Sequence, residues 1–316
     1  MREIPVLYIV VPCYNEHEVL KTTSEKLSEI VDKLINCGKI DKKSMIAFVD
    51  DGSKDNTWEL ICEEHDKREH VCGVKLSRNR GHQNALLGGL MTVKDDCDCT
   101  ISIDADLQDD INTIEDMVDK YLEGCEIVYG VRNKRKTDTF FKRTTAVAFY
   151  KMMKFMGVDC VFNHADYRLM SRCALDELEK FSEQNLFLRG MVPLIGFKSD
   201  MVYYDRLERF AGESKYPLKK MLSFAFDGIT SFSINPIRMI STIGLLTCLV
   251  TVIIFLYSII QKFRGATIPG WTSIMCSIWF LGGIQLLGIG LIGEYIGKMY
   301  KEVKARPRYT IEKYLK

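Results

Sequence analysis

Two long apolar stretches near the end of the chain most constrain what it can fold into. They cover residues 240–260 and 271–292 and contain no formally charged side chain. An α-helix rises about 1.5 Å per residue, so about 20 helical residues cross the roughly 30 Å of hydrocarbon in a bilayer. The connector between them is short and ends in Pro269-Gly270, a typical turn sequence. The pattern predicts a transmembrane hairpin, with helices over about 237–260 and 271–293.

The distribution of cations predicts the orientation of this hairpin. Lys and Arg in short flanking segments stay on the cytoplasmic side of a membrane. The connector carries Lys262 and Arg264, whereas the outer flanks carry more cations. We therefore expect a multi-pass protein of the cell membrane, with the large preceding domain and both termini in the cytoplasm. Eleven scattered cysteines without disulfide-type spacing agree with a reducing compartment. The flanking cations are Lys215, Lys219, Lys220, Arg238, Lys298, Lys301, Lys304, Arg306 and Arg308.

The residues before the hairpin alternate short β-branched runs with helical patterns. This alternation is typical of a Rossmann-like α/β domain with a mostly parallel sheet. A net charge of +1 argues against a nucleic-acid binder. We expect an α/β domain over 1–213, an amphipathic juxtamembrane segment over 214–235, the hairpin over 236–298 and a basic cytoplasmic tail over 299–316. The predicted strands are 6–11, 45–49, 71–76, 100–103 and 126–129, and the predicted helices are 18–34, 57–67, 82–93 and 112–122.

Polar clusters follow the first two predicted strands, where a parallel sheet binds its ligands. They are Pro-Cys-Tyr-Asn-Glu at 12–16 and Asp-Asp-Gly-Ser-Lys-Asp-Asn-Thr at 50–57. Turn and capping chemistry explains the later residues of the second cluster. It explains Asp50 and Asp51 poorly, because adjacent carboxylates repel unless they find donors. An aspartate at this position can accept the imide N–H of a uracil ring.

A third cluster follows the strand predicted at 100–103. Asp104, Asp106 and Gln108 offer hard oxygen ligands of the kind that Mg²⁺ and Mn²⁺ prefer. An isolated Asp-x-Asp pattern is common by chance, but its place after a buried strand favours a functional site. Asp109 and Asp110 either extend the negative loop or cap the helix that begins near residue 111.

Taken together, these segments resemble the GT-A-fold, family 2 glycosyltransferases. The closer resemblance is to polyprenyl-phosphate glycosyltransferases, which include dolichyl-phosphate mannose synthases and bactoprenol glucosyltransferases. It covers nearly the whole chain, hairpin included. One departure is that the family commonly continues Leu-Gln-Asp with Pro-Pro-Glu, whereas here residues 110–112 are Asp-Ile-Asn, which puts the geometry of the loop in doubt. The matching segments are 11–16, 50–57, 76–85, 104–109, 129–132, 165–170 and 206–216.

The resemblance implies an inverting, metal-dependent transfer of a hexose to undecaprenyl or another polyprenyl phosphate, for cell-envelope glycan modification. UDP-glucose is the expected donor. GDP-mannose, UDP-galactose and UDP-N-acetylglucosamine stay open as donors, and so does a catalytically inactive membrane scaffold. A processive polysaccharide synthase is disfavoured, because the chain has no Gln-x-x-Arg-Trp motif. Gly293-x-x-x-Gly297 permits close helix packing and suggests a homo-oligomer.

The resemblance also implies roles for single residues. Asp166 and Asp106 are the catalytic candidates, and Asp166 is a base, an acceptor for a sugar hydroxyl or the structural partner of Arg168. A phosphate nucleophile is already anionic near neutral pH, so it needs positioning more than deprotonation. The implied nucleotide-sugar ligands are Pro12, Tyr14, Asn15, Glu16, Asp51, Arg78 and Asp104; the ligands of Mg²⁺ or Mn²⁺ are Asp104, Asp106 and Gln108; those of the acceptor phosphate are Arg132, Arg206, Arg209, Ser214 and Lys215.

Overall fold

The computed structural model describes residues 2–133, 164–184, 186–205, 235–263 and 270–316. They fall into two compact units. The first holds the N-terminal α/β domain together with residues 305–316, and the second holds two long helices. Four predicted acceptor ligands, together with residues 214–234 of the predicted juxtamembrane segment, lie outside the described residues. These ligands are Arg206, Arg209, Ser214 and Lys215.

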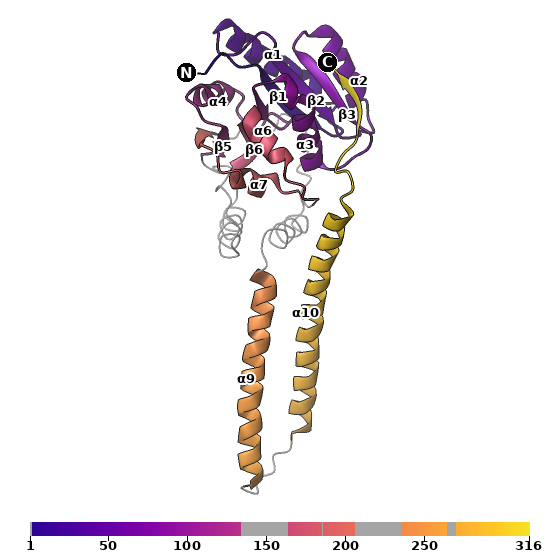
Figure 1. The fold of residues 1–316 in the computed structure, drawn as a ribbon. Coiled ribbons are helices and arrows are strands. Elements are labelled where there is room, and N and C mark those ends of the chain that lie inside the picture. Colours follow the sequence, from indigo (N-terminus) through magenta and orange to yellow (C-terminus); the bar gives the residue numbers. More distant parts are fainter. Residues whose placement is uncertain (1, 134–163, 185, 206–234, 264–269) are drawn as a thin grey trace. The chain divides into compact units, whose positions relative to one another are not determined.

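The described part of the α/β domain is built on an eight-stranded mixed sheet (Figure 1). Its strand order is β7-β5-β6-β4-β1-β2-β3-β8. Six strands share one direction, and β6 and β8 run antiparallel to their neighbours. The five strands expected from the sequence are confirmed to within three residues at each end, and β6, β7 and β8 are additions. The bounds are β1 Leu7–Cys13, β2 Met45–Asp50, β3 Val71–Leu76, β4 Cys99–Ser102, β5 Ile127–Arg132, β6 His164–Ser171, β7 Ser199–Tyr204 and β8 Ile311–Leu315.

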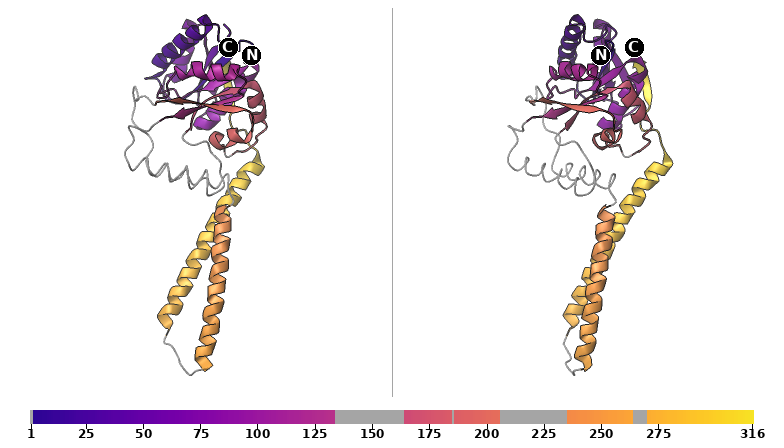
Figure 2. Two further views of the ribbon diagram at one scale, coloured as in Figure 1. Left: turned by 90° about the vertical axis from the view of Figure 1, so that its left-hand side faces the viewer. Right: turned by 60° about the vertical axis from the view of Figure 1, so that its left-hand side comes forward.

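Helices cover both faces of this sheet (Figure 2). Alternate residues of β1, such as Leu7 and Ile9, face a core formed with α1, α2 and α4. The other face carries α3, where Gly89 lets the helix approach closely, since a Cβ there would lie 2.4 Å from a Val49 methyl group. The four helices predicted from the sequence are confirmed, each to within two residues at either end. The bounds are α1 Leu20–Asn36, α2 Thr57–Lys67, α3 His82–Val93, α4 Thr113–Leu122, α6 Arg172–Glu179 and α7 Leu188–Leu194, with the 3₁₀ helix η1 at Lys94–Asp96.

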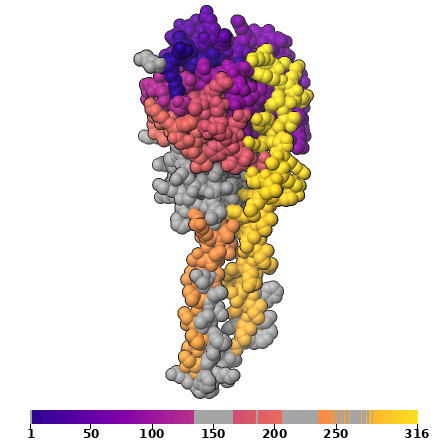
Figure 3. Space-filling model, in the orientation of Figure 1, coloured from indigo at the N-terminus to yellow at the C-terminus, as the bar shows by residue number. Residues whose placement is uncertain are grey.

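The C-terminal residues return to the α/β domain as an edge strand. β8 pairs antiparallel with β3, and the Ser77 amide donates to the Thr310 carbonyl at 3.0 Å. Just before β8, the Tyr309 ring packs over Gly88 of α3, and Arg308 donates to the Phe181 carbonyl at 2.7 Å. Figure 3 shows this yellow segment on the outer surface of the domain. The end of the expected basic tail is thus part of the sheet.

The second unit contains the antiparallel helices α9 (Asn235–Phe263) and α10 (Trp271–Lys304). Both begin at or near the predicted residues, but α10 continues eleven residues past the predicted end at 293. Within the described residues, Phe280–Lys304 is long and apolar enough to cross a membrane. No described atom lies within 4 Å of a Cβ built at Gly293 or at Gly297, and the homo-oligomer stays a prediction.

Candidate active site

The segments after β1 and β2 are joined by hydrogen bonds at the carboxyl edge of the sheet. The Asn15 amide donates to Ser53 Oγ at 3.0 Å, and Asn15 Oδ1 accepts from the Lys54 amide at 2.9 Å. The Glu16 amide donates to Thr57 Oγ1 at 3.0 Å. These contacts bring the first two predicted clusters together. Among the expected nucleotide ligands here, Pro12 is buried, Tyr14 is exposed, and Asn15 and Glu16 are half-buried.

Asp51 anchors the loop that leads from β3 into α3. Its Oδ1 accepts from the Arg80 amide at 2.7 Å and its Oδ2 accepts from the Gly81 amide at 2.9 Å. Burial raises the pKa of Asp51, and these two amides oppose that shift. These two backbone donors explain in part how adjacent aspartates are tolerated at the end of β2, because they offset the repulsion between the carboxylates. It also fixes the loop that carries the exposed Arg78, while binding of a uracil ring by Asp51 stays a prediction.

The loop after β4 carries the three predicted metal ligands. Its Ala105 carbonyl accepts from Thr23 Oγ1 of α1 at 2.7 Å, and Asp106 Oδ1 accepts from the Gln108 amide at 3.2 Å. Desolvation and the nearby carboxylates raise the pKa of Asp104. Such crowding of negative charge fits a bound cation. The described residues contain no group of three or more His, Cys, Asp and Glu side chains arranged to hold a metal ion. Mg²⁺ takes six oxygen ligands, so two carboxylates and one amide oxygen would leave positions for water or substrate oxygens.

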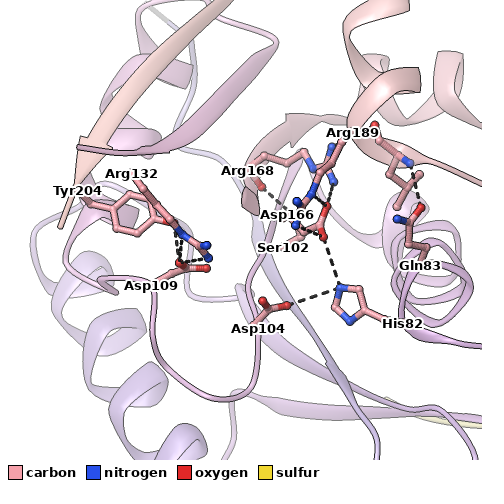
Figure 4. A network of polar contacts seen from close by, with 11 residues as sticks. His82, Gln83, Ser102, Asp104, Asp109, Arg132, Asp166, Arg168, Arg189 and Tyr204 are labelled. Atoms are coloured by element: carbon pink, nitrogen blue, oxygen red, sulfur yellow. Dashed lines mark hydrogen bonds and ion pairs between the residues drawn. The ribbon is translucent and has the colours of Figure 1, made fainter. Parts of the chain in front are cut away.

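Strand β6 places Asp166 across from Asp104. The antiparallel register pairs Ser102 of β4 with Arg168 of β6, and continuing this register by two residues brings Asp104 opposite Asp166. His82, the first residue of α3, lies between the two carboxylates, with Nε2 3.6 Å from Asp104 Oδ1 and 3.7 Å from Asp166 Oδ2 (Figure 4). The structure thus brings the catalytic candidate Asp166 and the metal candidate Asp104 to the same edge of the sheet.

Two arginines hold the Asp166 carboxylate. Arg168 donates to Oδ1 at 2.9 Å, and Arg189 donates to Oδ1 at 3.2 Å and to Oδ2 at 3.0 Å. Burial alone would raise the pKa of Asp166, but Arg189 and Arg168 lower it well below its usual range. Asp166 is therefore an ionised, oriented group. The ion pair with Arg168 was one of the three possibilities drawn from the sequence, whereas the pair with Arg189 was missed.

The start of α7 is fixed to the same network. The Leu188 amide donates to Gln83 Oε1 at 3.0 Å, and the Leu188 carbonyl accepts from Arg168 at 3.3 Å. These contacts position Arg189, the next residue along α7. No local sequence signal marks Arg189, because its contact with Asp166 depends on β6 and α7, which were not predicted.

Arg132, predicted to bind the acceptor phosphate, forms an ion pair with Asp109. Arg132 Nη2 lies 2.9 Å from Asp109 Oδ1, and the Tyr204 hydroxyl donates to the same oxygen at 2.5 Å. Burial and Asp109 raise the pKa of Tyr204, so its hydroxyl stays protonated and donates. Asp110, in contrast, accepts from the Asn112 amide at 3.0 Å next to the start of α4. The two adjacent acids therefore have different partners.

A Rossmann-like mixed sheet with an Asp-x-Asp loop at its carboxyl edge defines the GT-A class of glycosyltransferase. This chain belongs to glycosyltransferase family 2: the model described as "Glycosyl transferase family 2" matches residues 8–179. A second model, the "GtrB C-terminal hairpin", matches residues 235–299. This hairpin and the apolar helix Phe280–Lys304 together indicate association with a membrane.

Curated relatives match along almost the whole chain. An uncharacterised glycosyltransferase of Bacillus subtilis (strain 168), YkoT, is 59% identical over 308 residues, which cover 98% of this chain and 91% of the relative. The bactoprenol glucosyl transferase of Shigella phage SfII is 37% identical, covering 96% of this chain and 97% of that protein. A prophage bactoprenol glucosyl transferase homolog of Escherichia coli (strain K12) is also 37% identical, covering 96% and 98%.

Solved structures are more distant. Glucosyl-3-phosphoglycerate synthase from Mycobacterium tuberculosis, in complex with Mn²⁺, UDP and its product, is 17% identical with a TM-score of 0.44, covering 71% of this chain and 77% of that one. The mannosyltransferase PcManGT from Pyrobaculum calidifontis, in complex with GDP-Man and Mn²⁺, is 15% identical with a TM-score of 0.45, covering 96% and 88%. The family assignment therefore rests on the sequence matches.

Proposed function

We propose that this protein transfers a hexose, namely glucose from UDP-glucose, to undecaprenyl phosphate or a similar polyprenyl phosphate. The product is a lipid-linked monosaccharide for the modification of cell-envelope glycans. One observation carries the proposal: relatives called bactoprenol glucosyl transferases match 96% of this chain, including the sheet and the hairpin. A lipid acceptor explains why a glycosyltransferase domain and a membrane hairpin occur in one chain.

The nucleotide sugar is proposed to bind at the edge formed by residues 12–16, Asp51 and Asp104. Hydrogen bonds join the first segment to the loop after β2, and Asp51 fixes the loop of Arg78. The exposed Arg78 guanidinium offers a positive charge to the base or the diphosphate. These contacts support a preformed donor site.

A divalent ion, Mg²⁺ or Mn²⁺, is proposed to be held by Asp104, Asp106 and Gln108. When bound, such an ion stabilises the negative charge of a departing nucleoside diphosphate. The contribution of this chain is to present three oxygen ligands from one loop, in a region where burial and then neighbouring carboxylates raise the pKa of Asp104. The raised pKa supports a cation-binding role.

The acceptor phosphate is proposed to attack in one displacement, which inverts the anomeric carbon. The phosphate is already anionic near neutral pH, since its second pKa is about 6. Its proposed ligands are Arg132 and, beyond the described residues, Arg206, Arg209, Ser214 and Lys215. The lowered pKa of Asp166 makes this carboxylate a weak base, which favours a role in orienting the sugar or its neighbours over proton abstraction.

The test is transfer of radiolabelled sugar from a panel of UDP- and GDP-sugars into undecaprenyl phosphate by the purified full chain. We expect label in the lipid phase from one donor, with Mg²⁺ or Mn²⁺ present and not with chelator. Asp104→Asn is expected to abolish transfer. Asp95→Asn is the matched control, because Asp95 is 71% exposed and forms a surface ion pair with Arg172.

The same assay separates the open alternatives. Label from GDP-mannose, UDP-galactose or UDP-N-acetylglucosamine would keep the reaction and change the donor. No label from any donor, with wild type and Asp104→Asn behaving alike, would reject the transferase and favour an inactive membrane scaffold. Transfer that persists fully in chelator would reject the proposed divalent ion and leave the transferase activity standing.

A further inference from the structure

The metal loop, defined as residues 104–110, is held to the rest of the domain by side chains from four elements. Thr23 of α1 donates to its Ala105 carbonyl, and the Tyr167 hydroxyl of β6 donates to its Asp110 carbonyl at 3.1 Å. The remaining two anchors, from β5 and β7, converge on Asp109. The loop therefore has a defined shape, although it contains no proline and Leu107 has a positive φ of 49°.

Asp109 is the most heavily anchored residue of this loop. It is 2% exposed, and its Oδ1 accepts from Arg132 Nη2 at 2.9 Å, Arg132 Nε at 3.3 Å and the Tyr204 hydroxyl at 2.5 Å. Tyr204 also receives a hydrogen bond from Arg132 Nε at 3.2 Å. Figure 4 shows the three side chains pointing toward one another. A buried carboxylate with such charge-assisted hydrogen bonds has a fixed position.

The sheet brings the two partners of Asp109 together. β5 and β7 are parallel neighbours, and their register pairs Arg132 with Tyr204. Tyr204 is further fixed by the Tyr167 ring, which packs edge-on at 5.4 Å between ring centroids. Asp109 follows Gln108 directly, so the carboxylate held at the edge of the sheet is one residue from the nearest proposed metal ligand.

We propose that Asp109, Arg132 and Tyr204 form a clamp that positions Asp104, Asp106 and Gln108 for a divalent ion. The inference rests on the proposed function, in which these three residues hold the ion. The three clamp residues are positioning residues, because they act on the ion through the loop. Partners outside the direct ligand set commonly change metal affinity by about 10- to 100-fold. The clamp is compatible with an acceptor role for Arg132, since a guanidinium has five N–H donors.

The test compares Tyr204→Phe with Tyr203→Phe in the detergent-solubilised full chain. Tyr203 is the matched control, because it adjoins Tyr204 on β7 but is 59% exposed and contacts Met201 rather than the loop. Mn²⁺ binding is measured by the loss of the free-ion electron paramagnetic resonance signal in the presence of UDP. We expect the dissociation constant for Mn²⁺ to rise on the order of tenfold in Tyr204→Phe and to stay unchanged in Tyr203→Phe.

Thermal unfolding without metal separates positioning from simple destabilisation. A folded Tyr204→Phe variant with wild-type Mn²⁺ affinity would overturn the clamp, as would a wild type that binds no Mn²⁺ with UDP. Arg132→Lys keeps the charge but loses the planar fork, and its Mn²⁺ affinity is expected to fall between those of wild type and Asp109→Asn. If Tyr204→Phe fails to fold, equal Mn²⁺ affinities in wild type and Arg132→Lys would overturn the clamp. Weakened Mn²⁺ binding in Tyr204→Phe, together with no transfer to lipid by the wild type, would support the clamp and reject the proposed function.

Discussion

Gly52 lies where two loops of the proposed donor site touch, and any side chain there would collide with the backbone of the second loop. Its φ is 64°, and a Cβ would lie 2.6 Å from the backbone of Arg78 and Asn79. Gly38 has a similar φ of 68° with nothing within 4 Å of its Cβ position among the described residues. Both alanine substitutions are expected to lower the free energy of unfolding by about 1–2 kcal/mol, because alanine disfavours the left-handed conformation. We predict that only Gly52→Ala also shifts the Arg78 loop.

The shift is checked by activity and stability together. Displacement of a binding group by about 1 Å can cost roughly 100-fold in activity, so Gly52→Ala is expected to lose most of its sugar transfer. Gly38→Ala is expected to keep wild-type activity at a temperature where it is folded. Equal activities for the two variants would show that the contact between the loops is unimportant for the donor.

Asp166 is expected to stabilise the fold as well as the active site. Asp166→Asn leaves the buried Arg168 without its counter-charge, a change that typically costs about 3–5 kcal/mol. The native pKa of Asp166 is lowered, so its stabilising effect is present above the ordinary aspartate pKa of about 3.9 and is lost as the pH falls below it. We predict that the free energy of unfolding of Asp166→Asn differs from that of wild type by a constant amount between about pH 5 and about pH 8. The difference is expected to shrink at more acidic pH.

Thermal unfolding of the full chain across this pH series measures the effect. Asp95→Asn serves as the control, since its exposed pair with Arg172 is worth at most about 1 kcal/mol. A stability loss in Asp166→Asn that grew toward acidic pH would contradict the lowered pKa.

Single residues at the site were predictable where they directly follow an apolar strand. Asp51 and Asp104 were chosen as candidates in this way, because the runs before them are buried and end abruptly. The distant partners of Asp166 and Asp109 were not predicted. The contacts of Asp166 with Arg189 and of Asp109 with Tyr204 join segments far apart in the chain, and one sequence gives no pairing between such segments.

At the scale of elements, β8 is expected to stabilise the loop that Asp51 anchors. β8 covers the edge of β3, and the Thr310 carbonyl accepts from Ser77, the first residue of that loop. Each backbone hydrogen bond lost costs about 0.5–1.5 kcal/mol. We predict that deleting residues 311–316 lowers stability by several kcal/mol and speeds amide exchange in β3 and residues 77–81.

Hydrogen exchange followed by mass spectrometry measures this change. Lys313→Ala removes an exposed side chain and keeps the backbone ladder, so its exchange pattern is expected to match wild type. Unchanged protection of residues 77–81 after the deletion would show that Asp51 alone holds the loop.

The missed strands have physical reasons. β6 buries Asp166 and Arg168, so its sequence lacks the apolar run that identified the other central strands. β8 has exposed charged residues, as edge strands commonly do, and it follows a long apolar helix in a segment that reads as a basic tail. The strands β1 to β5 and helices α1 to α4 were predictable because their apolar periodicity agrees with their burial.

At the scale of the whole molecule, the sheet itself constrains how the chain crosses a membrane. β1 precedes the hairpin and β8 follows it, yet both belong to one sheet. A chain that leaves a domain and returns to it crosses a membrane an even number of times, so we predict that α9 and α10 cross once each. From the excess of Lys and Arg on the outer flanks we predict that the sheet lies in the cytoplasm.

Reporter fusions in bacterial cells test this topology. Alkaline phosphatase, which is active only outside the cytoplasm, is expected to be active when inserted within residues 264–269 and inactive when fused after Lys316. Green fluorescent protein is expected to show the opposite pattern. Because the hairpin sets the crossings, deleting β8 should leave both patterns unchanged while it weakens the sheet. Active phosphatase at the C-terminus of the intact chain would mean that β8 cannot pair with β3 in the same molecule, and both the topology and the edge strand would have to be revised together.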